Sequence, residues 1–171
     1  IYDLPKPTIA QVQGACVGGG FMVANMCDLM VASEDAFFAD PVVHMVATTG
    51  AEVLIAPYVL GFRKAKELMF TGERILAKDA HMLGMVNRLV PREQLEEETL
   101  AMANRIAKAP PFAIKMTKKS LNRALDMTGF REAVNAHHHT HLLAHQSAET
   151  KRLFASLDSQ NVVQVAKDKQ R

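Results

Sequence analysis

The sequence has no tryptophan, only 6% aromatic residues and two cysteines among 171 residues. It also has no apolar run of about 18 residues, so we expect no membrane span. No charged leading segment is followed by an apolar one, so we expect no signal peptide either. The formal net charge of +2 gives no reason to expect nucleic acid as a partner. These absences predict a cytoplasmic protein with no membrane or nucleic-acid partner.

The two cysteines lie in apolar surroundings, Cys16 in an expected strand and Cys27 at the end of the segment that follows it. Such surroundings suit small buried hydrophobic side chains better than a disulfide or a metal pair. We expect both to be reduced core residues. The remaining composition, 49% hydrophobic and 22% charged, is typical of a globular domain.

Three consecutive glycines, Gly18 to Gly20, separate two apolar segments. Residues 8–17 predict a strand, and residues 20–26 predict a helix surrounded by protein because they are apolar nearly all round. Where a glycine turn opens a helix, unpaired N–H groups point outward and the helix dipole favours negative charge. The turn is therefore a candidate site for an anion or a developing oxyanion.

Short strands and helices alternate in the first half of the chain. We expect strands over 29–32, 36–40 and 86–89, and helices over 51–60, 63–70 and 77–83. Pro41 cannot donate a ladder hydrogen bond and so ends the strand before it. We expect Asp40 to be a turn or surface residue, and Asp28 to be a structural hydrogen-bonding group at a helix exit. This order of elements is typical of an α/β layered core.

The second half is expected to be helical. After Pro91 a stripe at helical spacing predicts one helix, and it comprises Leu95, Thr99, Met102 and Ile106. We expect the neighbouring Glu96 to Glu98 to face solvent. Pro110-Pro111 ends this helix and begins another. In that helix the residues expected to face the core are Ile114, Leu121 and Leu125, and those expected to face away are Lys115, Lys118, Lys119 and Arg123.

The glycine triplet belongs to a longer series of motifs. In chain order they are Lys6-Pro7, Ile9-Ala10, Gly14-x-x-x-Gly18-Gly19-Gly20, Cys27-Asp28, Ala36-x-Phe38-x-x-Pro41, Arg63-x-Ala65-x-Glu67, Thr71-Gly72, Ala80 and Gly84-Met85-Val86-Asn87. In this order and spacing they resemble the crotonase superfamily, the enoyl-CoA hydratase and isomerase family.

The resemblance implies a fold and a division of the chain. Residues 1–91 would form the C-terminal part of a crotonase-like ββα spiral core, and residues 92–171 a helical region that builds trimers, or hexamers as dimers of trimers. It also implies a front portion before residue 1, which in the family supplies the first strands, part of the pocket for the CoA adenine and a second oxyanion N–H. Apolar residues on the expected C-terminal helices agree with self-association and equally with a core inside the chain: Leu142, Leu143, Leu153, Phe154, Leu157, Val162, Val163 and Val165.

The implied activity is acyl-CoA processing through a thioester enolate, with coenzyme A as part of the substrate and no other cofactor. By resemblance, Gly19 matches the residue that donates one N–H to the enolate oxygen. The residues expected to line the acyl thioester are Val17, Gly18, Gly20, Met22, Pro41, Val42 and His44.

The sequence departs from the family at the two hydratase glutamates, which correspond to Met22 and Val42. Neither side chain transfers protons, so ordinary hydration is in doubt. Isomerisation, thioester hydrolysis, decarboxylation and C–C cleavage share the same oxyanion and stay open. The alternative is a non-catalytic subunit that binds acyl-CoA or serves assembly.

Three other groups are candidate replacements for the glutamates or candidate metal ligands. Glu52 is a candidate single general base, or simply an acid that stabilises the start of a helix. His44 is a candidate proton shuttle, or a structural histidine. His137, His141 and His145 recur every fourth residue, but no Cys, Asp or Glu is placed to complete a metal site, so we expect none.

Overall fold

The computed structural model describes residues 1–45 and 48–156. The strands are β1 (Ile9–Val12), β2 (Ala15–Val17), β3 (Leu29–Ser33), β4 (Phe37–Ala39), β5 (Ile75–Leu76) and β6 (Arg88–Val90). The α-helices are α1 (Gly19–Asn25), α2 (Ala56–Leu60), α3 (Phe62–Thr71), α4 (Ala77–Met82), α5 (Leu95–Ala107), α6 (Pro111–Asp126), α7 (Phe130–Gln146) and α8 (Ala148–Ser156). Single 3₁₀ turns cover Pro41–His44, Ala51–Ile55 and Arg92–Gln94.

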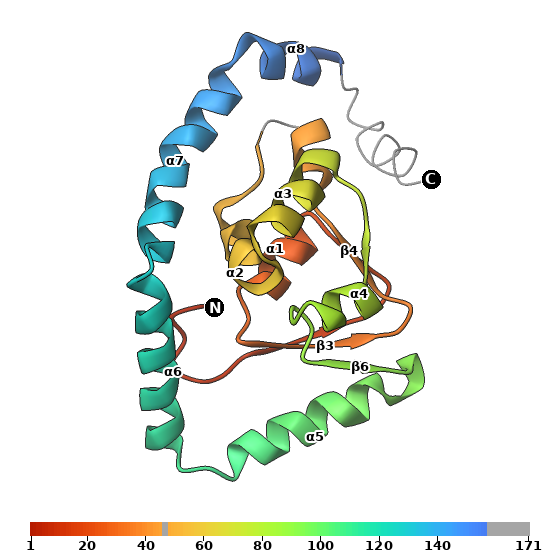
Figure 1. Ribbon diagram of the computed structural model, residues 1–171, viewed down its shortest axis with the longest axis vertical. Coiled ribbons are helices and arrows are strands. Elements are labelled where there is room, and N and C mark those ends of the chain that lie inside the picture. The colour runs from red at the N-terminus through yellow and green to blue at the C-terminus, as the bar shows by residue number, and fades with distance from the viewer. Residues whose placement is uncertain (46–47, 157–171) are drawn as a thin grey trace.

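The strands form two sheets of three strands each. One has the order β1-β3-β6 and is parallel throughout. The other has the order β2-β4-β5, with β2 parallel to β4 and β5 antiparallel to β4. Helices pack around both sheets (Figure 1). The α/β class expected from the sequence is confirmed.

A turn at Gly14 divides the segment that we predicted as one strand. Gly14 has a φ of 60°, which glycine adopts without the steric cost that a Cβ would add. The chain therefore leaves one sheet after Val12 and enters the other at Ala15. The prediction of a single strand over 8–17 is wrong, because the apolar pattern continues through the turn.

The apolar core surrounds α1, which lies between the sheets and helices α2 and α3 (Figure 1). Phe21 is fully buried and its ring centroid lies 6.1 Å from that of Phe38 in β4. Val23 on the same helix is 56% exposed. The prediction that α1 is buried all round is therefore wrong for one of its faces.

Both cysteines are free. Cys16 is buried, and its burial raises the pKa of the thiol to about 11. Cys27 is half-buried at the end of α1, so the expectation of a core residue holds for Cys16 and is wrong for Cys27. The thiol of Cys16 therefore stays protonated near neutral pH.

Helix α5 covers one face of the β1-β3-β6 sheet. Leu95 packs there with Val31 and Val90 in a second buried cluster, as the predicted stripe requires. Glu98 does not face solvent as expected, because Arg88 Nη1 lies 2.9 Å from its Oε2 and the glutamate is half-buried. An ion pair to β6 thus fixes one side of this helix.

The predicted helices of the first half occur where the sequence indicates them. The predictions over 63–70 and 77–83 correspond to α3 and α4 within two residues. The prediction over 51–60 divides into the 3₁₀ turn Ala51–Ile55 and α2. The strand predicted at 86–89 begins at Arg88 as β6.

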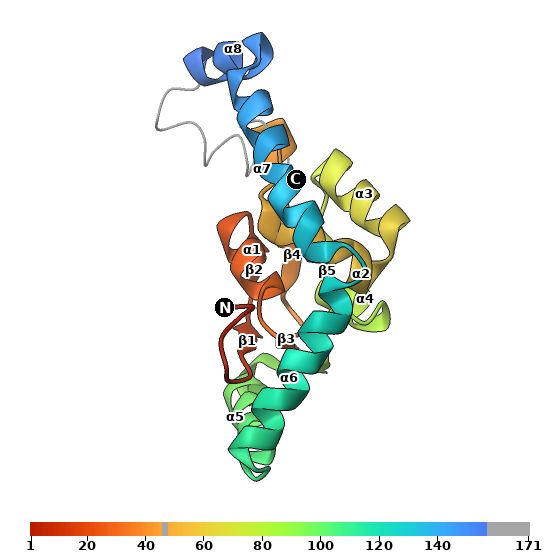
Figure 2. The same ribbon diagram turned by 90° about the vertical axis from the view of Figure 1, so that its left-hand side faces the viewer.

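Helices α6, α7 and α8, which we call the helical arm (residues 111–156), run along one side of the molecule (Figures 1 and 2). Lys118 of α6 is only 8% exposed, and its Nζ donates to Asp28 Oδ2 at 2.7 Å. The same carboxylate accepts hydrogen bonds from the backbone N–H and the hydroxyl of Thr8. Asp28 is therefore the structural hydrogen-bonding group that we expected.

Two positions of α6 differ from the predicted orientation, whereas the half-buried Ile114 and Leu125 agree with it. Lys118 was expected to point away and is buried, whereas Leu121 was expected to be buried and is 66% exposed. The ion pair with Asp28 favours this orientation, because the ammonium group of Lys118 is buried and needs an acceptor beside it. Farther along, Leu143 and Phe154 are exposed; Leu157, Val162, Val163 and Val165 lie outside the described residues.

Replacing Lys118 with Met is expected to lower the free energy of unfolding by roughly 2 kcal/mol, since it removes a charge-assisted hydrogen bond to Asp28, which keeps its hydrogen bonds from Thr8. Urea unfolding followed by circular dichroism measures the change. Lys119→Met is the matched control, because Lys119 lies next to Lys118 and is exposed. Equal losses in the two variants would contradict a stabilising role for the ion pair.

Candidate functional site

The site that the sequence predicts lies at the carboxyl ends of β2 and β4. These strands are parallel, with Val17 paired to Ala39, so the segments that leave them begin side by side. The backbone N–H of Gly18 donates to the carbonyl of Ala39 at 3.1 Å. The glycine turn therefore emerges next to the segment that begins with Pro41.

The glycine turn opens α1. Gly18 has a φ of 55°, a conformation that costs little without a Cβ, and Gly19 is the first residue of the helix. The first N–H groups of a helix have no partner within it. A Cβ built at Gly18, Gly19 or Gly20 meets no atom within 4 Å. The N-terminal end of α1 thus faces open space.

Met22 and Glu52 come together beside Gly50. A Cβ built at Gly50 would lie 2.7 Å from Glu52 Oε2 and 2.9 Å from Met22 Cε. Glu52 lies in the first turn of the 3₁₀ segment Ala51–Ile55 and is exposed, whereas Met22 is half-buried on α1. A carboxylate therefore lies next to Met22.

Pro41, Val42 and His44 form the 3₁₀ turn that follows β4. Pro41 is buried and Val42 is half-buried. His44 Nε2 lies 2.9 Å from the carbonyl oxygen of Phe70 in α3, and because a carbonyl only accepts, Nε2 carries the proton. This contact gives His44 a structural partner, which is the alternative role that the sequence left open.

Asp40 is buried where the sequence predicted a turn or surface residue. It begins the turn Pro41–His44 as expected, yet it is 1% exposed. The hydroxyl of Thr49 donates to its Oδ2, and no partner among the described residues reaches Oδ1. Burial raises the pKa of Asp40, against hydrogen bonds from Thr49 and the backbone of Val42 that lower it. The neighbouring Pro41 signals a turn but does not reveal burial.

The histidines of α7 contact the site at one point. His137 Nε2 lies 2.8 Å from the carbonyl oxygen of Thr49. The rings of His141 and His145 lie 4.3 Å apart between centroids, and His145 Nδ1 bonds to the carbonyl of His141. Across 1–45 and 48–156, no three His, Cys, Asp or Glu side chains gather closely enough to hold a metal ion.

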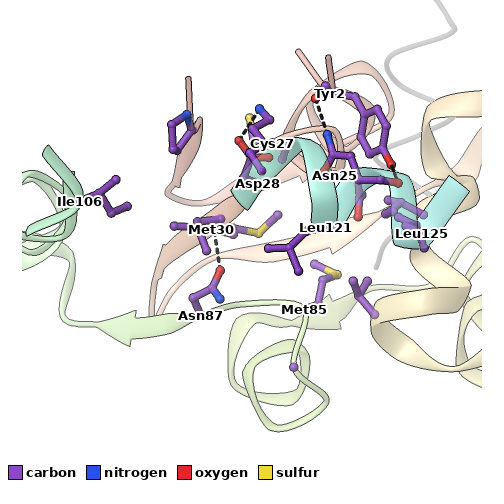
Figure 3. A pocket seen from close by; sticks show the side chains of 18 of the residues that line it. Tyr2, Asn25, Cys27, Asp28, Met30, Met85, Asn87, Ile106, Leu121 and Leu125 are labelled. Atoms are coloured by element: carbon purple, nitrogen blue, oxygen red, sulfur yellow. Dashed lines mark hydrogen bonds and ion pairs between the residues drawn. The ribbon is translucent and has the colours of Figure 1, made fainter. Parts of the chain in front are cut away.

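A cavity of about 500 Å³ lies at the opposite end of α1 (Figure 3). Its wall includes Asn25 and Cys27, with Asp28 beside them, and apolar side chains of α6 such as Leu121 and Leu125. Neither the glycine turn nor Glu52 lines it. The cavity and the glycine turn are therefore separate places on the molecule.

Comparison with known proteins assigns the family. The model of the enoyl-CoA hydratase/isomerase family matches residues 1–160. The chain belongs to this family. The resemblance to the crotonase superfamily is thereby confirmed. The matched residues include the glycine turn and the Phe-x-x-Pro motif.

Individual family members agree with this assignment. The chain is 44% identical over 143 residues to "Putative enoyl-CoA hydratase EchA13" of Mycobacterium tuberculosis, covering 84% of this chain and 45% of that protein. The crystal structure of an enoyl-CoA hydratase/isomerase from Xanthobacter autotrophicus superposes with a TM-score of 0.84 at 34% identity, covering 96% of this chain and 61% of that one. That of a monofunctional enoyl-CoA isomerase from M. smegmatis gives 0.68 at 32% identity, covering 73% and 59%.

The chain spans about half the length of the curated family members that it matches. Within 1–45 and 48–156, no helix has the length and apolar character that a bilayer crossing requires. Two members of the family are named for an activity on enoyl-CoA, one as a hydratase and one as an isomerase.

Proposed function

We propose that the chain contributes to an acyl-CoA enzyme that stabilises a thioester enolate at the glycine turn. The observation that carries this proposal is the open N-terminal end of α1, where Gly19 presents a backbone N–H beside the ends of β2 and β4. An enolate oxygen is strongly negative, and an aimed N–H in such a position lowers the barrier to its formation.

Within this family, we propose double-bond isomerisation as the reaction that fits best. Isomerisation moves one proton between two carbons of the acyl chain, so a single carboxyl can remove it and return it. Hydration needs separate groups to activate water and to handle the proton. By resemblance, Met22 and Val42 correspond to the glutamates of family hydratases, and one carboxylate, Glu52, lies next to Met22.

In this proposal Glu52 removes the proton while the N–H of Gly19 stabilises the enolate oxygen, and Glu52 then returns the proton to the other carbon. The thioester would lie against residues at the carboxyl ends of β2 and β4, namely Val17, Gly18, Gly20, Met22, Pro41, Val42 and His44. Coenzyme A takes part as the carrier of the acyl group, and no other cofactor is required.

We also propose that the helical arm mediates self-association into trimers or hexamers. Its support is the number of exposed apolar side chains that the arm presents, among them Phe112, Leu121, Met127 and Leu143. Contiguous exposed apolar surface commonly marks an interface.

A panel of CoA thioesters tests the proposed reaction. We expect a 3-enoyl-CoA to be converted to the 2-enoyl isomer, and crotonyl-CoA to be hydrated far more slowly. If hydration is as fast as isomerisation, Met22 and Val42 do not cause a loss of hydratase activity. Binding of CoA esters without turnover of any thioester would favour the non-catalytic alternative.

A further inference from the structure

Two contacts from distant parts of the chain converge on Thr49. Its hydroxyl donates to Asp40 Oδ2 at the end of β4. Its carbonyl oxygen accepts from His137 Nε2 of α7 at 2.8 Å, across 88 residues of sequence. Thr49 is thus held from both sides, by the strand that precedes the acyl-site segment and by the helical arm.

The contact with Asp40 is costly to lose. Asp40 is 1% exposed and its Oδ1 has no hydrogen-bond partner among the described residues. A buried carboxylate depends on the few donors that it has. The hydroxyl of Thr49 is the side-chain donor that reaches it in the described part of the chain, so both groups are fixed by their pairing.

The contact with His137 has a defined direction. A carbonyl oxygen only accepts hydrogen bonds, so the ring must donate from Nε2. The neighbouring ring of His141 lies 5.9 Å away between centroids and does not take part in this hydrogen bond. A side chain that donates from the same place, such as glutamine, could replace the ring.

The position of Thr49 determines the position of the candidate base. Gly50 follows directly, and the carboxylate of Glu52 folds back over it, with Oε2 2.7 Å from the position of a Cβ built there. The backbone N–H of Val53 bonds to the carbonyl of Gly50 at 3.3 Å, which ties Gly50 to the turn that carries Glu52. A displacement of Thr49 would therefore move the carboxylate of Glu52 relative to Gly19.

We propose that Asp40 and His137 are positioning residues that hold Thr49 and thereby set the place of the Glu52 carboxylate beside Met22 of α1. The inference rests on the proposed role of Glu52. It assigns a task in the acyl site to the helical arm, since α7 supplies one of the two contacts. Asp40 and His137 act through Thr49 and do not touch the thioester.

His137→Leu and His137→Gln, compared in the full chain, test the contact by hydrogen exchange of the amides of residues 50–53. We expect exchange to become about fivefold faster in His137→Leu, as for the loss of one hydrogen bond, and to return toward the wild-type rate in His137→Gln. His139→Ala is the matched control, because His139 is exposed on the same helix. Thr49→Val should raise exchange as His137→Leu does.

Turnover gives the second readout. We expect kcat for the thioester to fall roughly tenfold or more in His137→Leu with little change in KM, because misplacement of a catalytic group weakens the chemical step. His137→Gln should restore most of it. Unchanged exchange and kcat in His137→Leu, with melting unaltered, would overturn the proposal.

The two hypotheses can fail separately. If exchange responds to His137→Leu but turnover does not depend on Glu52, the contact with Thr49 exists and the catalytic role of Glu52 is wrong. If turnover depends on Glu52 and neither His137→Leu nor Thr49→Val changes kcat or exchange, the proposed function stands and the positioning role is wrong.

Discussion

Gly19→Pro is expected to lower kcat for the thioester by roughly two to three orders of magnitude, which is the usual effect of removing one oxyanion donor. Proline has no N–H, so the substitution removes the donor itself. The fold should tolerate the change, because Gly19 is the first residue of α1 and proline is favoured at that position of a helix. Steady-state kinetics with the best thioester of the panel measures it.

Gly19→Ala is the matched control for this experiment. It adds a Cβ at the same place, which meets no atom within 4 Å, and it keeps the N–H. We expect it to retain most of the activity and to melt near the wild-type temperature. If alanine and proline reduce kcat equally, the loss comes from bulk at the glycine turn, and the N–H of Gly19 is not the oxyanion donor.

Glu52→Gln is expected to lower kcat by roughly two to four orders of magnitude, the contribution that general acid–base catalysis typically makes. Glutamine is similar in shape and can still accept a hydrogen bond, but it cannot take and return a proton. Steady-state kinetics of both proteins with the best thioester of the panel measures this difference.

Glu96→Gln serves as the control for the loss of one negative charge. Glu96 lies in the first turn of α5 and is exposed, so its replacement should leave kcat unchanged. If Glu52→Gln also leaves kcat unchanged, Glu52 is not the general base. Its role is then the structural one, that of an acid that stabilises the start of the turn Ala51–Ile55. The proton acceptor would then have to be another group.

Much of the first half of the fold could be predicted because its signals are local. The apolar stripes of α3 and α4 lie within single helices, and the glycines at 18–20 mark the start of α1 where the structure has it. The family resemblance also predicts that the segments at Gly18 and Pro41 lie in one site. Their adjacency follows from the parallel pairing of β2 with β4.

The errors arise where a distant partner decides the outcome. The helical pattern predicts that Lys118 faces solvent. It is buried because it pairs with Asp28, which lies 90 residues earlier in the chain. Asp40 reads as a turn residue, and its partner Thr49 and its burial depend on how the following segment folds back. Gly14 ends a strand through its backbone conformation, which the apolar pattern around it does not reveal.

Two of the long-range polar contacts of the helical arm, Lys118 with Asp28 and His137 with Thr49, close loops of 90 and 88 residues. Closing loops of this length costs chain entropy before either contact stabilises anything. Contacts so far apart in sequence also slow folding. We therefore expect the arm to dock late, after the sheets have brought Asp28 and Thr49 into place, so that the candidate site acquires its final geometry in the last steps of folding.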